Sequence, residues 1–109
     1  MAEDRVLRES VRSLSREGRE FVLRYSLAMQ DTENGQQCCI QASVNERTNL
    51  GTDRQTGCRV EMSHVHPDMG KRIFEFIAGA EEPVFPVHVP EIVRDQLSVT
   101  WSVAVRPSR

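Results

Sequence analysis

Two neighbouring segments of this chain carry an apolar residue at every second position, and this alternation limits the possible folds more than any other feature. From Phe21 to Met29 every odd position is apolar, and the even positions up to residue 30 include arginine, serine and glutamine. From Cys38 to Val44 the apolar positions are the even ones. A period of two is typical of a strand with one buried face. Asn34-Gly35 lies between the segments and suits a tight turn, so we predict an antiparallel hairpin over residues 20–45.

A third strand and a helix are predicted after this hairpin. Residues 58–64 alternate again, with Cys58, Val60 and Met62 on one side. Pro67 and Asp68 then suit the first turn of a helix, where a missing N–H is harmless and a negative charge is favourable. We expect this helix to span residues 67–79 and to end at Gly79. Its predicted apolar stripe comprises Met69, Ile73, Phe76, Ile77 and Ala80, with Phe74 outside it.

The remaining third of the chain repeats these signals. Pro90 and Glu91 open a predicted helix over residues 90–97, and we expect an extended connector over residues 84–89 because it is bounded by prolines. Residues 99–105 alternate in the manner of a final strand, which Pro107 is expected to end.

Two segments are less regular. Residues 5–14 fit either a helix or a strand, and we favour the strand because Glu17-Gly18 would form a hairpin turn with the next strand. Residues 46–57 are polar and contain two glycines, so we expect a mobile surface loop. Together the segments predict an α+β fold, with an antiparallel sheet and two helices, in a single domain over residues 1–109.

The charge of the chain argues against general binding of nucleic acid. The formal net charge is −2, so no global field attracts phosphate. The exception is an arginine-rich segment near the N-terminus, in which bases outnumber the interspersed acids. Its members are Arg5, Arg8, Arg12, Arg16, Arg19 and Arg24. This segment supports an alternative hypothesis of a regulator that binds nucleic acid.

The cysteines and the hydropathy indicate a cytoplasmic protein. Three cysteines cannot complete a disulfide framework, and two of them, Cys38 and Cys39, are adjacent. The first residues lack the apolar core of a signal peptide, and no apolar run approaches the roughly 18 residues that span a bilayer. We therefore expect a reducing compartment and no contact with membranes.

The hairpin residue Tyr25, the segment Ile73–Ile77 and the run Pro86–Leu97 together resemble a family of small bacterial proteins that is defined only as a domain of unknown function. The resemblance covers about residues 20–97. It implies a small bacterial cytosolic protein. Because that family has no assigned activity or catalytic residues, the resemblance carries no site onto this chain.

Candidate chemistry is sparse. His64 and His66 would leave one face of a continuing strand and so form the basis of a second alternative, a metal-dependent sensor or enzyme. The competing interpretation makes His66 a cap of the helix that starts at Pro67. Of the adjacent cysteines, Cys38 should face the core and Cys39 the polar side, where a thiol could react. We predict no catalytic residue, no bound metal, no cofactor and no small-molecule ligand.

The favoured hypothesis is therefore a non-enzymatic interaction module whose partner is another protein or a second copy of itself. Its predicted interface is the C-terminal strand, in which apolar residues alternate without a charged residue among them. Such an edge favours pairing with another strand. The interface residues are Val99, Trp101, Val103 and Val105.

Overall fold

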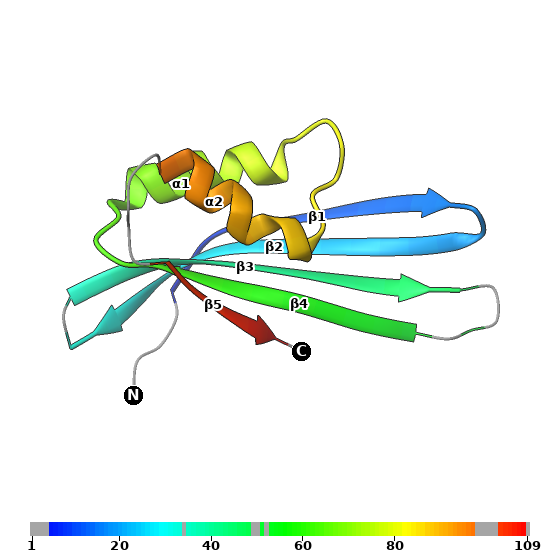
Figure 1. The fold of residues 1–109 in the computed structure, drawn as a ribbon, viewed down its shortest axis with the longest axis horizontal. Coiled ribbons are helices and arrows are strands. Elements are labelled where there is room, and N and C mark those ends of the chain that lie inside the picture. Colours follow the sequence, from blue (N-terminus) through cyan, green and yellow to red (C-terminus); the bar gives the residue numbers. More distant parts are fainter. Residues whose placement is uncertain (1–4, 34, 49–50, 52, 98–102, 109) are drawn as a thin grey trace.

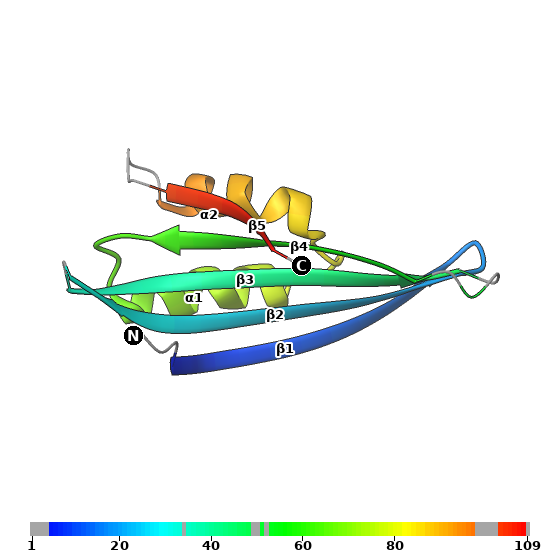
Figure 2. The same ribbon diagram turned by 90° about the horizontal axis from the view of Figure 1, so that it is seen from below.

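A five-stranded antiparallel sheet forms one layer of the molecule, and its strands are ordered as in the chain (Figure 1). The computed structural model describes residues 5–33, 35–48, 51, 53–97 and 103–108. The strands are β1 (Arg5–Arg16), β2 (Arg19–Thr32), β3 (Gly35–Arg47), β4 (Asp53–Met62) and β5 (Val103–Ser108). Three helical segments, α1 (Pro67–Ala78), the 3-10 turn η1 (Pro86–His88) and α2 (Val89–Leu97), lie on one face of the sheet. The predicted α+β fold is confirmed, and Figure 2 views it from the face that the helices leave open.

The N-terminal segment is a strand, as favoured, and the helical alternative is wrong. β1 pairs with β2 along its length and closes at Arg16 opposite Arg19. The two turn residues, Glu17 and Gly18, have φ values of 49° and 77°. Two consecutive positive φ values fit the turn that matches the twist of a hairpin. This turn places β1 at one edge of the sheet.

The core lies between the helices and the alternating residues of β2, β3 and β4, which confirms the predicted hairpin. Leu23, Leu27 and Ile40 have no exposed surface. Tyr25 is buried beside them and donates a hydrogen bond of 2.7 Å to the carbonyl of Val84. The hydroxyl is thereby satisfied within the core, as a buried polar group requires.

Helix α1 is present but its buried face differs from the predicted stripe. Phe74 is only 4% exposed, whereas Phe76 is 54% exposed and Met69 is also exposed. The buried line runs through Gly70, where an added Cβ would lie 2.9 Å from the Sγ of Cys38. Ile73 and Ile77 of the predicted stripe are buried, as expected. Glycine gives no hydropathy signal, so the apolar pattern alone misassigned the positions of Met69, Phe74 and Phe76.

The polar segment 46–57 is mostly strand, so the prediction of a loop there is wrong. β3 continues to Arg47 and β4 begins at Asp53. Residues 53–56 are exposed. A strand with solvent on both sides needs no apolar residue, and its composition then resembles that of a loop.

Three further boundaries differ from the predictions. β4 ends at Met62 and is followed by a turn, so it does not continue to residue 64. The connector 84–89 contains the turn η1 where an extended chain was expected. The last strand, described over Val103–Ser108, continues through Pro107, which lies opposite Cys58 and was expected to end it. Residues 99–102 of the predicted strand lie outside the described residues. A proline is compatible with an edge strand because its missing N–H can face away from the ladder.

Candidate interaction surfaces

The edge of the sheet at β1 is protected against pairing with another strand. Five of its twelve residues are charged, four of them arginines. The register also shifts between Val6 and Arg8, in the manner of a β-bulge. Charged side chains and bulges are the usual devices that stop edge strands from associating. Two copies joined along this edge would also bring their arginines together.

The opposite edge, at β5, lacks most of this protection. Its six residues include one charged residue, Arg106, and one proline, Pro107, both in its second half. The first half, Val103–Val105, carries neither. Val103 lies opposite Met62 and Val105 opposite Val60 in the ladder with β4. Of the predicted interface residues, these two belong to an edge strand, whereas Val99 and Trp101 lie outside the described residues.

The open face of the sheet is polar, and part of it is held together by its own hydrogen bonds. The amide of Gln37 donates to Gln30 Oε1 and to Glu61 Oε2, at 3.0 Å each. Arg59 donates to the same Gln30 oxygen at 3.2 Å and forms an ion pair with Glu61 at 3.7 Å. This network links β2, β3 and β4 and satisfies its own charged groups, so it offers few free groups to a partner.

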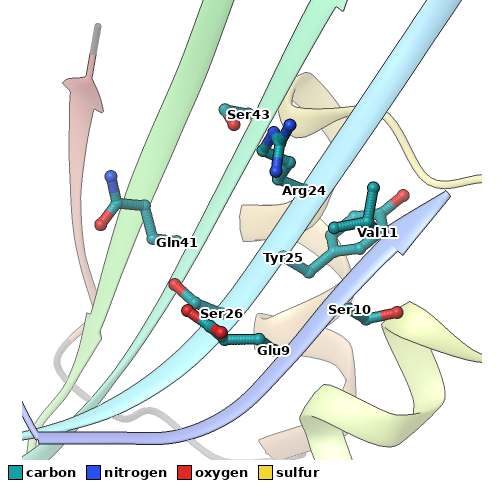
Figure 3. A pocket seen from close by; sticks show the side chains of 8 residues that line it. All are labelled: Glu9, Ser10, Val11, Arg24, Tyr25, Ser26, Gln41 and Ser43. Carbon is teal, nitrogen blue, oxygen red and sulfur yellow. The ribbon is translucent and has the colours of Figure 1, made fainter.

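A hydrophilic depression of about 280 Å³ lies on the open face between β1, β2 and β3 (Figure 3). It is lined by Glu9, Ser10, Val11, Arg24, Tyr25, Ser26, Gln41 and Ser43. Figure 3 shows Glu9 beside Ser26 and Arg24 toward Ser43, with Gln41 on the far side. The lining supplies hydroxyl, amide, carboxylate and guanidinium groups but no histidine or cysteine. Sequence reasoning missed this depression because its members come from three separate strands.

Three of the N-terminal arginines have different surroundings in the fold. Arg12 donates hydrogen bonds to the carbonyls of Ala78, Ala80 and Glu81, at and after the end of α1. A cation there compensates the partial negative charge of a helix C-terminus. Arg19 pairs with Glu46, and Arg24 lines the depression on the open face. These three arginines therefore serve different parts of the fold, and the nucleic-acid hypothesis stays a prediction.

His64 and His66 lie in the connection to α1 and not on a continuing strand. His64 is in a turn with a φ of 61°. His66 is the N-cap of α1, where its Nδ1 accepts a hydrogen bond of 3.1 Å from the backbone N–H of Asp68. The capping role predicted for His66 is thus confirmed. In the part of the chain that the structure describes, no three side chains of the metal-binding types are grouped to hold an ion.

All three cysteines are buried, and no disulfide joins these described residues. Cys38 lies in the core as predicted, but Cys39 is only 2% exposed, so its expected accessibility is wrong. Cys39 lies opposite Ala28 and Glu61 in the ladders, between the longer residues of the open face. Burial raises the pKa of the Cys38 thiol. Burial also raises the pKa of the Cys58 thiol, although a hydrogen bond with the backbone of Ala42 lowers that pKa in part. The reactive thiolate of these two residues is disfavoured.

Comparisons with protein families, with curated proteins and with solved structures find no match to this chain. The resemblance to a bacterial family therefore stays a prediction. Among the described residues, no helix is long and apolar enough to span a lipid bilayer.

Proposed function

We propose that this chain is a non-enzymatic interaction module of the cytosol that associates with a second copy of itself. The observation that carries the proposal is the difference between the two edges of the sheet. β1 is long, charged and bulged, whereas the first half of β5 has no charge, bulge or proline. Since natural sheets protect the edges that must stay unpaired, the less protected edge is the one suited to a partner.

The rest of the described surface supports a role in binding rather than in catalysis. The buried cysteines disfavour a thiolate nucleophile, and His66 is engaged as a helix cap. The depression on the open face has a carboxylate and hydroxyls but no neighbouring imidazole to act as a base at neutral pH. Reduced cysteines are typical of a cytosolic protein, which supports the proposed compartment.

The proposal is tested by the mass of the protein in solution. Light scattering on the eluate of a sizing column, run over a range of loading concentrations, is expected to give twice the chain mass at micromolar concentration. Dilution should restore the monomer, because an interface of one short strand is small. A mass equal to one chain at every concentration up to the millimolar range would rule out the proposed self-association.

A further inference from the structure

We infer that two copies join β5 to β5 in antiparallel orientation about a two-fold axis at Ala104, so that their sheets become continuous. This inference rests on the proposed self-association and specifies its interface. It follows from the backbone alone, through the pairing of β5 with β4.

Pro107 fixes which backbone groups of β5 point outward. In an antiparallel ladder, residues with both N–H and C=O directed at the neighbouring strand alternate with residues that direct both away. Pro107 has no N–H, so its pairing with Cys58 is of the second kind. Val105 and Val103, two and four positions earlier, therefore direct their N–H and C=O away from β4. Ala104 and Arg106 direct theirs toward it.

The other end of the sheet gives the same alternation independently. The hairpin between β2 and β3 closes at Thr32 opposite Gly35 across two residues, a closing pair that exchanges hydrogen bonds. Carried along β3, this makes the even residues, such as Ile40, bond to β4. Within β4, Val60 then directs its N–H and C=O toward β3, and Glu61 directs its own toward β5. Ala104 lies opposite Glu61, so its backbone groups bond to β4, whereas the backbone groups of Val105 point away from β4.

One register between two copies satisfies these free groups within the described strand. When Ala104 lies directly opposite Ala104 of the second copy, Val103 of each chain pairs with Val105 of the other. Every outward N–H and C=O of both valines then has a partner. An axis at Val105 would pair Val103 with Pro107, and the Val103 carbonyl would lack a donor because proline has no N–H. An axis at Val103 would leave Val105 without a partner inside the described strand. The two-fold arrangement is of the isologous kind that most dimers use.

The register brings the two copies of Ala104 together. They form a pair without mutual hydrogen bonds, for which the Cα atoms are about 4.5 Å apart. This separation lies within the range of about 4.4–6.8 Å that a disulfide spans. The two copies of Val105 are displaced along the strands by two residues, or about 6.6 Å, in addition to the spacing between strands. A disulfide between them is therefore out of reach.

The test is cysteine cross-linking in the full chain under mild oxidation. Ala104→Cys is expected to convert most of the protein to a disulfide-linked dimer, and the matched control Val105→Cys to stay largely unlinked. The parent, whose three cysteines are buried, should stay unlinked as well. If the protein is a dimer by light scattering but Ala104→Cys stays unlinked, or Val105→Cys links equally well, the inferred register is wrong while self-association stands. If the parent protein is monomeric, both the inferred register and the proposed self-association are wrong.

A second measurement needs no variant. In a mixed sample of isotope-labelled and unlabelled chains, the α-hydrogens of the two Ala104 residues should show an intermolecular NMR contact, because such hydrogens face each other in this kind of pair. Contacts between chains that involve other strands, without one at Ala104, would overturn the inference.

Discussion

Replacing Leu27 with alanine is expected to lower the free energy of unfolding by about 2–5 kcal/mol. The side chain has no exposed surface, lies opposite Ile40 in the sheet and approaches the backbone of α1 at Gly70. Removing it leaves a cavity between the sheet and the helix, where neither side can easily collapse. Urea unfolding followed by circular dichroism measures the difference.

The matched control for this substitution is Val11→Ala on the neighbouring strand. Val11 is 55% exposed on the open face. Its truncation is expected to change the free energy of unfolding by no more than about 0.5 kcal/mol. A Leu27→Ala loss equally small would show that the helices do not cover this face of the sheet.

Replacing Val105 with proline is expected to raise the dissociation constant of the proposed dimer by about 10–100-fold. The substitution removes an outward N–H, and the two-fold axis doubles the loss to two hydrogen bonds of about 0.5–1.5 kcal/mol each. It removes no bond within the chain, because the N–H of Val105 faces away from β4. Sedimentation velocity over a concentration series measures the change.

The control for Val105→Pro is the same substitution one residue earlier. The N–H of Ala104 faces Glu61 in β4, so Ala104→Pro should disrupt the sheet within the chain and lower the free energy of unfolding. Val105→Pro should leave that energy nearly unchanged. A Val105→Pro variant that dimerises as tightly as the parent would exclude this edge from the interface.

The sequence predicted the elements whose pattern reflects one buried face. The hairpin of β2 and β3 and the two helices follow from periodicity, and the turn at Glu17-Gly18 revealed β1. Periodicity fails where burial is absent or where size matters more than hydropathy. The outer part of β4 has solvent on both sides, and the contact of α1 at Gly70 depends on the lack of a side chain.

The candidate site was predictable in part for a related reason. The alternation near the C-terminus indicated Val103 and Val105 as interface residues, and they lie on an edge strand. The sequence does not show which strand lies beside β5, because strand order depends on contacts between distant segments. Without that order, the direction of each backbone N–H is unknown, and so is the register with a second copy. The burial of Cys39 has the same origin, since its cross-strand neighbours are distant in sequence.

Amide hydrogen exchange, measured residue by residue by NMR over a dilution series, tests the central claim most directly. Ala104 and Arg106, whose N–H groups face β4, should be protected at every concentration. Val103 and Val105 should be protected only at concentrations where light scattering shows the dimer, and should exchange rapidly after dilution. Rapid exchange at Val103 and Val105 in a sample that is fully dimeric would contradict the claim that two copies meet along β5.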